Sequence, residues 1–587
     1  MRLRRSPADA VAAPERPVPA TIPEPRTAGR ARLGDLLVRR DAVAPADLRA
    51  ALGLQPDRGL RLGELLVELG VVTEDDVAAG LAEQSGLDVV DLNRETSDPE
   101  AVAALPESLS RSLLAVPLRR TEDGALVVAV ADPAPVTIEQ LRAAAGVDLV
   151  VRVAALGQVR RRLDAVYRAL AGVADQVEAF SGRAGVQAIV RRTDLDADGD
   201  DAPVVRIVTM VLTQALRDRA SDVHLEPQDG RVRVRYRIDG ALHEVLSLPA
   251  DMGAALASRV KVMAGMNIVE RRRPQDGQIS TTIDDRPVDI RIATTGTVWG
   301  EKVVLRILDT ARGVLRLPEL GMPARTHEAY GRLIRSPYGM VICAGPTGSG
   351  KTTTLYASMA EINNEDRNIT TIEDPVEYVI PSITQIQINE AAGITFAGGL
   401  KSVLRQDPDV ILVGEMRDVE TARIAVQSAL TGHFVLSSLH ATDTVSALYR
   451  FLDMGIEAFL VASSVTGVVG QRLVRRSCRH CRVRYSPSAE ELAFYESSGG
   501  SGKSEFWTGE GCPACSGTGY SGRVGVYELL TVTEEMRQLL VMPSPSHDAM
   551  RRLAVEQGMR PLRAEGVRLV EEDETTLAEI LRSIYIV

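Results

Sequence analysis

The sequence is poor in aromatic residues, which make up 4% of its 587 residues, and its formal net charge of −11 leaves no excess of basic side chains. Proteins that hold single-stranded nucleic acid stack its bases on aromatic rings within basic grooves. This composition argues against a helicase or DNA translocase. We expect no direct nucleic-acid binding, although a local basic channel is compatible with the charge.

Long apolar runs are also missing. No stretch reaches the roughly 18 apolar residues of a membrane-spanning helix. The basic start, Met1 to Arg5, is not followed by the apolar segment of a signal peptide. Proline and alanine dominate residues 1–29, which we expect to form a disordered tail. We therefore predict a cytoplasmic protein with no transmembrane segment, associated with the inner face of the cytoplasmic membrane through partner proteins.

Cysteine is scarce, and four of the five cysteines are paired in the sequence. Cys343 lies in an apolar run and is predicted to be a core residue. The other four form two Cys-x-x-Cys pairs: Cys478 with Cys481, and Cys512 with Cys515. In a reducing compartment this pattern favours a structural zinc site over disulfides. The long spacing between the pairs predicts an inserted loop that includes Glu490 to Gly500.

A complete Gly-x-x-x-x-Gly-Lys-Thr motif lies between an apolar run at 340–344 and a predicted helix at 353–362. Its glycines let backbone N–H groups surround phosphate oxygens, and the helix N-terminus adds partial positive charge. Lys351 is expected to reach the β- and γ-phosphates of ATP, and Thr352 to hold Mg²⁺. The predicted ATP-binding residues are Gly345, Pro346, Thr347, Gly348, Ser349, Gly350, Lys351, Thr352 and Thr353.

Two predicted apolar strands, at 369–372 and 410–413, end in acidic residues. Glu373 and Asp374 follow the first strand, and Glu415 follows the second. Ligands of doubly wound α/β sheets bind beyond the carboxyl ends of the strands, so we expect both acidic groups to face the phosphate loop. Carboxylates there can hold Mg²⁺ and polarise an attacking water.

Two of the seven histidines flank the next predicted strand, at 434–439. A lone histidine is more often structural than functional. Because His433 and His440 lie beside a predicted nucleotide site, their spacing favours a sensor of the γ-phosphate.

Residues 204–312 are predicted to form a middle domain with one amphipathic helix, at 205–219, and strands that alternate basic and apolar residues. Strict alternation places the basic side chains on one face of a half-buried sheet. Such a face favours an anion, and the nearby phosphate is the candidate; a solvated charged face is the alternative. The arginines concerned are Arg235, Arg237, Arg291 and Arg306.

A duplicated pattern lies within residues 30–88. Arg32-Leu33-Gly34 recurs 29 residues later as Arg61-Leu62-Gly63, and Gln55 recurs as Gln84. Each copy predicts two short amphipathic helices. A helical hairpin that packs on itself explains the leucines, whereas the repeated arginine, glycine and glutamine favour a ligand site. We further predict an α+β docking domain at 89–170 and an acidic flexible linker at 171–203.

Together these motifs resemble the type II secretion and type IV pilus assembly ATPases over about residues 30–587. That family carries a phosphate loop, an Asp box (here 371–377), a Walker B motif ending in Gly-Glu (Gly414-Glu415) and a His box (431–440). The resemblance implies a multidomain α/β fold with N-terminal α-helical and α+β domains. The remaining parts would be a PAS-like α+β middle domain at 204–312 and a RecA-like P-loop core with a mainly parallel sheet at 313–587, which includes a zinc subdomain at 476–525.

The resemblance also implies roles for single residues. Glu373 would be the general base or position the attacking water, and Glu415 would act through Mg²⁺ and its waters. His440 would sense the γ-phosphate with support from His433. The four middle-domain arginines would reach phosphate across a domain or subunit boundary.

The N-terminal repeat resembles the cyclic di-GMP-binding domain of pilus ATPases, in which each copy supplies half of the site. The residues implied are Arg32, Leu33, Gly34 and Gln55 in the first copy, and Arg61, Leu62, Gly63 and Gln84 in the second. Asp41 departs from the pattern, since it stands where the second copy has Gly70, the residue that the family favours.

The function implied is an ATP-hydrolysing homohexamer that powers type IV pilus assembly through an inner-membrane platform protein. Other cytoplasmic assembly proteins would contact the N-terminal domains. Extension is favoured over retraction, because retraction motors generally lack the long N-terminal region and the four-cysteine zinc site. Two alternatives stay open: a type II secretion ATPase that drives pseudopilus assembly, and a regulator that binds ATP and cyclic di-GMP without turnover.

Overall fold

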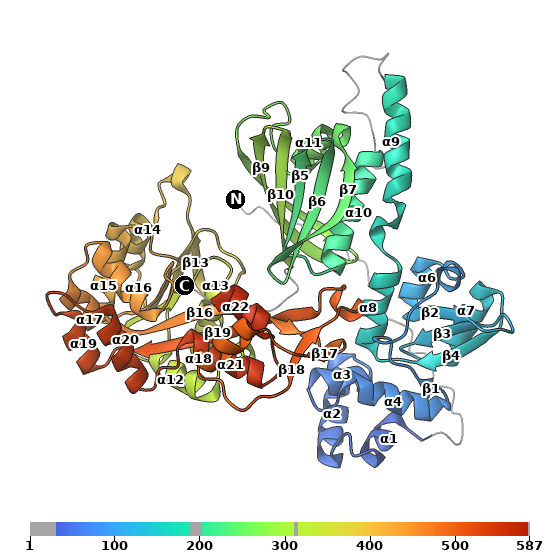
Figure 1. Ribbon diagram of the computed structural model, residues 1–587, viewed down its shortest axis with the longest axis horizontal. Coiled ribbons are helices and arrows are strands. Elements are labelled where there is room, and N and C mark those ends of the chain that lie inside the picture. The colour runs from blue at the N-terminus through green and yellow to red at the C-terminus, as the bar shows by residue number, and fades with distance from the viewer. Residues whose placement is uncertain (1–30, 188–201, 310–314, 585–587) are drawn as a thin grey trace, which may run out of the picture. The chain divides into compact units, whose positions relative to one another are not determined.

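The computed structural model describes residues 31–187, 202–309 and 315–584 (Figure 1). The chain separates into two compact units, Met1–Val159 and Arg160–Val587. The predicted tail at 1–29 lies outside the described residues, as does the acidic stretch at 188–201. No described helix is long and apolar enough to cross a membrane.

Four helices form the N-terminal repeat, two from each copy as predicted. They are α1 (Leu33–Arg39), α2 (Pro45–Arg58), α3 (Leu62–Glu68) and α4 (Glu74–Ser85). Leu37 of the first copy and Leu65 and Leu66 of the second are buried in one shared core. Neither copy therefore buries its apolar face without the other.

A small α+β domain follows, with strand order β1-β4-β3-β2 among its described strands. β3 and β4 are parallel, and β2 and β3 are antiparallel. The strand predicted at Leu126 is confirmed, and every residue of it is buried. The elements are β1 (Asp88–Val89), α5 (Pro99–Ala103), α6 (Glu107–Ser112), β2 (Ala115–Arg120), β3 (Leu126–Val130), α7 (Pro135–Ala145) and β4 (Leu149–Val153).

The flexible linker predicted at 171–203 is wrong over its first half. After α8 (Leu156–Val166) and η1 (Ala169–Gly172), the chain forms helix α9 (Val173–Gln187). Val173, Val177 and Phe180 follow helical spacing and pack against the core of the middle domain. The acidic run that suggested a linker begins only at Asp194, outside the described residues.

The middle domain is a sheet with strand order β7-β6-β5-β10-β9-β8 in the described part of the chain (Figure 1). Alternate positions such as Val232, Val234 and Tyr236 are buried against α10 and α11, and charged side chains occupy the other positions. The elements are α10 (Pro203–Arg217), β5 (Asp222–Gln228), β6 (Arg231–Ile238), β7 (Ala241–Pro249), η2 (Ala250–Met252), α11 (Gly253–Met263), β8 (Gln275–Ile283), β9 (Arg286–Thr297) and β10 (Gly300–Asp309).

Helix α11 was not predicted, because its buried Lys261 interrupts the apolar face. The Lys261 ammonium pairs with Glu301 and donates to the carbonyl oxygen of Glu270 at 2.6 Å. The buried charge is thus paired and hydrogen-bonded, as a charge in a core requires.

The ATPase core is a doubly wound sheet with strand order β13-β12-β14-β15-β11-β16-β19 among the described residues. Adjacent strands are parallel except β16 and β19. Buried side chains of α12 and α13 cover one face, and those of α14 to α17 cover the other. The elements are η3 (Leu317–Leu320), α12 (Ala324–Ile334), β11 (Gly339–Ala344), α13 (Lys351–Ile362), β12 (Ile369–Glu373), β13 (Thr384–Gln387), η4 (Glu390–Ala392), α14 (Phe396–Val403), β14 (Val410–Val413), α15 (Val419–Leu430), β15 (Phe434–Leu439), α16 (Thr444–Asp453), α17 (Ala458–Ser464) and β16 (Val465–Ser477).

The segment between the two cysteine pairs is folded, and the predicted inserted loop is helix α18 for most of its length. Ser488 caps α18 by accepting from the backbone N–H of Glu491 at 3.2 Å. The remaining elements are β17 (Arg482–Tyr485), α18 (Ala489–Ser497), β18 (Phe506–Gly509), η5 (Pro513–Cys515), β19 (Tyr520–Thr531), α19 (Glu534–Leu540), α20 (His547–Glu556), α21 (Leu562–Glu571) and α22 (Leu577–Ile584).

Candidate nucleotide site and metal centre

The phosphate loop joins the buried strand β11 to helix α13. Gly348 and Gly350 have φ values of 76° and 88°, a region that favours glycine. A Cβ atom on Gly350 would lie 2.7 Å from Gln471 Nε2, which leaves no room for a side chain. The backbone therefore takes a shape in which successive N–H groups can surround an anion.

Lys351 lies inside this loop and is 9% exposed. Its Nζ donates to the carbonyl oxygens of Gly345 at 2.9 Å and Pro346 at 3.0 Å. Burial lowers the pKa of Lys351, and the nearby Glu415 carboxylate opposes that effect. Ser349 Oγ is buried and has no hydrogen-bond partner within the described residues. A phosphate oxygen would satisfy both side chains.

Thr352 and Thr353 are exposed on the first turn of α13. Their hydroxyl groups lie at the carboxyl end of β11, where an Mg²⁺ ion bridging two phosphates is held in phosphate-loop proteins. The loop, Lys351 and these hydroxyls together fit a nucleotide polyphosphate with its metal.

Glu415 follows β14 and belongs to a polar cluster at the carboxyl edge of the sheet. His440 Nε2 lies 3.3 Å from Glu415 Oε2. Arg417 pairs with Glu415, and its Nη1 lies 3.6 Å from Asp374 Oδ2. Sequence reasoning missed Arg417, although it stands only two residues beyond the Gly-Glu of the Walker B pattern. The cluster brings two acids to the edge where Mg²⁺ was expected.

Glu373 is held apart from that cluster, in a buried network. It is 3% exposed. Glu373 Oε1 accepts hydrogen bonds from Thr371 Oγ1 at 2.5 Å and from Gln385 Nε2 at 3.2 Å, and Oε2 accepts one from Tyr356. A general base has to reach the proton that it removes. The role implied for Glu373 therefore requires this network to open.

The two histidines of the predicted sensor lie at opposite ends of β15. His440 follows its carboxyl end, beside Glu415, whereas His433 precedes its first residue and has Nδ1 3.1 Å from the carbonyl oxygen of Ser428. Six residues of strand lie between them, so their Cα atoms are about 23 Å apart at about 3.3 Å per residue. Within one chain, β15 carries His433 away from the phosphate loop, and the supporting role of His433 stays a prediction.

Three of the four predicted arginines contact acids of their own sheet. Arg235 Nη2 donates to Glu226 Oε1 at 2.7 Å, and Arg306 Nε donates to Asp222 Oδ1 at 3.1 Å. Arg237 Nε lies 3.5 Å from Asp222 Oδ2. Burial opposes ionisation of Glu226, but hydrogen bonds from Arg235 and neighbouring basic side chains outweigh it and lower the pKa of Glu226 to about 2. This basic face thus contains anions of its own.

Arg291 is the predicted arginine that reaches beyond its sheet. Its Nη1 donates to Glu377 Oε2 at 3.1 Å, and its Nη2 donates to the carbonyl oxygen of Val376 at 2.8 Å. Both partners belong to the Asp box. Arg291 therefore links the middle domain to the segment that follows Glu373.

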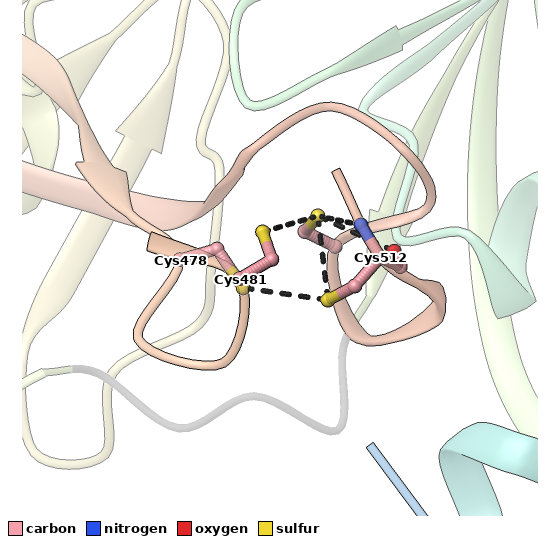
Figure 2. A group of neighbouring side chains, drawn as sticks. Cys478, Cys481 and Cys512 are labelled. Carbon is pink, nitrogen blue, oxygen red and sulfur yellow. Dashed lines mark hydrogen bonds between the residues drawn. The ribbon is translucent and has the colours of Figure 1, made fainter. Parts of the chain in front are cut away.

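The four paired cysteines converge, with their Sγ atoms all within 4.8 Å of one another. Figure 2 labels Cys478, Cys481 and Cys512 of this group. The Sγ distances are 3.8 Å for Cys478 to Cys512, for Cys481 to Cys515 and for Cys512 to Cys515. Tetrahedral zinc with about 2.3 Å Zn–S bonds places its sulfurs about 3.8 Å apart. A disulfide needs a separation of about 2.05 Å. The arrangement fits zinc.

Neighbouring groups favour the thiolate of Cys515, whereas the hydrogen bond to Cys515 raises the pKa of Cys478 and burial raises that of Cys481. The hydrogen bond from Cys478, aided by the N–H groups of Cys512 and Gly519 and opposed by burial, lowers the pKa of Cys515 to about 4. Gly509 and Gly519 cross so closely that a Cβ atom on Gly519 would lie 2.4 Å from the Gly509 carbonyl oxygen. The two glycines let the two cysteine loops meet.

The N-terminal repeat has packing reasons for two of its three recurring residue types. Gln55 Nε2 donates to the carbonyl oxygen of Leu60 at 3.2 Å, and Gln84 Nε2 donates to that of Ala31 at 2.9 Å. Each glutamine thus holds the residue before the Arg-Leu-Gly of the other copy. A Cβ atom on Gly34 or Gly63 would lie 3.1 Å or 2.8 Å from a side-chain carbon of Leu48 or Val77, respectively.

Packing does not account for the arginines. Arg32 is exposed, and its guanidinium makes no hydrogen bond or ion pair among the described residues, whereas Arg61 pairs with Asp132. Both stand at N-caps, of α1 and α3. Asp41 and Gly70 share positive φ values of 56° and 69°, so the family's preference for glycine there has a backbone reason.

The fold and site define a phosphate-loop ATPase-type protein of mixed α/β architecture, in which a four-cysteine cluster is attached to the core sheet. The chain belongs to the type II/IV secretion system protein family, whose match covers residues 197–582. An MshEN domain matches residues 85–173. That second match covers the predicted docking domain and lies beyond the two Arg-Leu-Gly sequences.

Relatives carry names from both branches of the family. Type II secretion system protein HxcR of Pseudomonas aeruginosa is 50% identical over 390 residues, 66% of this chain and 79% of that protein. Type IV pilus assembly ATPase PilB of Myxococcus xanthus is 37% identical over 94% of this chain and 98% of its own length. Type II secretion system protein E of Xanthomonas campestris pv. campestris is 38% identical over the same shares.

Proposed function

We propose that this chain is an ATP-hydrolysing motor that works as a homohexamer. The observation that carries the proposal is the placement of Lys351, Ser349 and the Glu415–His440 pair at the carboxyl edge of one parallel sheet. Lys351 would bind the β- and γ-phosphates, Thr352 and Glu415 would hold Mg²⁺, and His440 would sense the γ-phosphate. Glu373 would serve as general base once released from its buried network.

The work of the motor would be type IV pilus assembly through an inner-membrane platform protein. The full-length similarity to PilB and the MshEN match support this reading. Nucleotide binding would move the middle domain against the core, and the platform protein would receive that motion. The type II secretion role is the second candidate, supported by the similarity to HxcR and by the equally long match to type II secretion system protein E of Xanthomonas campestris pv. campestris. Deleting the gene and counting surface pili and secreted proteins would separate the two.

Steady-state hydrolysis by the full-length chain, with particle mass measured alongside, tests the motor proposal. We expect Mg²⁺-dependent turnover in a particle of about six chains, and a loss of roughly 100-fold or more in kcat for Glu373→Gln, because a general base contributes about 10²–10⁴-fold. A wild-type chain that binds ATP without turnover, even with platform protein present, would favour the regulator instead.

A separate prediction concerns cyclic di-GMP, which we propose binds the repeat through Arg32 and Arg61. Arg32→Ala should weaken binding at least about tenfold, because a hydrogen bond to a charged group contributes about 1.5–3 kcal/mol. Calorimetric titration of the full-length protein measures the change. Arg49→Ala is the control, since Arg49 is exposed on α2 and the second copy has Ala78 there. No binding by the wild type would leave the repeat a purely structural unit.

A further inference from the structure

Tyr356 joins three elements of the ATPase core at one hydroxyl group. It lies on α13, five residues after Lys351, and is 2% exposed. Its hydroxyl donates to Glu373 Oε2 and accepts from the backbone N–H of Glu377 at 3.2 Å. Burial, with the Glu373 carboxylate as a second cause, raises the pKa of Tyr356 well above its ordinary value. The hydroxyl therefore remains a donor throughout the ordinary pH range.

The hydrogen bond from Tyr356 completes the enclosure of Glu373. Oε1 already accepts from Thr371 and Gln385, so Tyr356 supplies the donor on the other oxygen. In this arrangement donors surround both carboxylate oxygens of Glu373, and burial keeps the group from solvent.

The same hydroxyl is tied to the middle domain through the Asp box. Glu377 donates its N–H to Tyr356 and accepts Arg291 Nη1 at its carboxylate. The ring of Tyr378 packs edge-on against that of Tyr356, with centroids 6.3 Å apart and planes at 75°. By binding residues 376 and 377, Arg291 also fixes the N–H of Glu377 and the neighbouring ring of Tyr378, which both contact Tyr356.

We propose that Tyr356 is a positioning residue that restrains Glu373 in its buried network until the middle domain releases the Asp box. This inference rests on the proposed ATPase function. Moving Arg291 away would free residues 376–378, and Tyr356 could then turn from Glu373. Glu373 would gain access to water on the same helix-and-strand edge that carries Lys351.

Steady-state hydrolysis by full-length Tyr356→Phe, Arg291→Gln and the double variant tests this, with kcat and KM for ATP measured separately. Tyr356→Phe keeps the ring and removes only the donor. It should raise basal kcat severalfold and leave KM within about twofold, because the restraint acts on the base and not on nucleotide binding. Arg291→Gln should raise kcat in the wild type and change little in the Tyr356→Phe background, as for residues in one network.

Tyr330→Phe is the matched control, because Tyr330 is also fully buried and its hydroxyl lies 2.8 Å from Ser358 Oγ on α13, away from Glu373. Its kcat should stay at the wild-type value. An unchanged or reduced kcat in Tyr356→Phe would overturn the restraint, and additive effects of the two substitutions would overturn the link to Arg291. A wild type without turnover would overturn the ATPase proposal itself.

Discussion

Replacing Lys351 with alanine should lower kcat for ATP hydrolysis by at least about 100-fold, since removing one preorganised ligand of developing negative charge costs about 10²–10³-fold. The loss of kcat should lie at the upper end of this range, because Lys351 Nζ also donates hydrogen bonds to two carbonyl oxygens of the loop. Without it, the carbonyls of Gly345 and Pro346 would face the phosphates and repel them. Steady-state phosphate release measures kcat, and titration with a fluorescent nucleotide separates binding from chemistry.

Lys401→Ala is the control for this substitution. Its Nζ lies 2.6 Å from Glu420 Oε1, and both side chains are exposed. Exposed pairs of this kind contribute about 0–1 kcal/mol to stability, so hydrolysis should stay near the wild-type rate. If Lys351→Ala hydrolysed ATP as fast as Lys401→Ala, the loop at 345–352 would not be the site of turnover.

Replacing Cys515 with serine should reduce bound zinc from about one ion per chain to near zero, because structural zinc sites use four protein ligands. Cys515 is buried, and its Sγ lies 3.8 Å from the Sγ atoms of Cys512 and Cys481. Its replacement would leave three thiolate ligands for the metal. Structural zinc contributes about 10–16 kcal/mol in zinc-finger peptides, so the subdomain should unfold at a markedly lower temperature. Elemental analysis and calorimetry of the full-length protein would report both losses.

Cys343→Ala provides the comparison, because Cys343 is the one cysteine outside the two pairs and is buried in β11. This variant should keep its full zinc content. A wild-type protein that binds no zinc, or a Cys515→Ser variant that keeps it, would contradict a structural metal at this cluster.

Most of the correct predictions came from short sequence motifs. The phosphate-loop pattern specifies both a strand before it and a helix after it, and β11 and α13 occupy those positions. The Cys-x-x-Cys pairs likewise define a ligand set whose geometry zinc imposes. The multidomain α/β fold with a mainly parallel core was implied by the family resemblance that these motifs carry.

The contacts that could not be predicted are those between side chains far apart in the sequence. Glu373 was expected to face the phosphate loop, but donors from α13 and β13 enclose it. The arginines on the middle-domain sheet were expected to need a foreign anion, yet Asp222 and Glu226 lie among them. His433 and His440 were assigned to one site although they flank a predicted strand, and the six extended residues of β15 place them at its opposite ends.

Strand β16 connects the phosphate loop to the cysteine cluster. Gln471 of this strand accepts a hydrogen bond from Thr354 at 2.8 Å and packs against the phosphate loop, while Cys478 directly follows its last residue. Roughly 23 Å of one continuous strand separates them, at about 3.3 Å per residue. A partner that pulled on the cysteine cluster would therefore displace the phosphate loop through β16. If the chain hydrolyses ATP as proposed, its turnover would depend on tension as well as on ATP concentration.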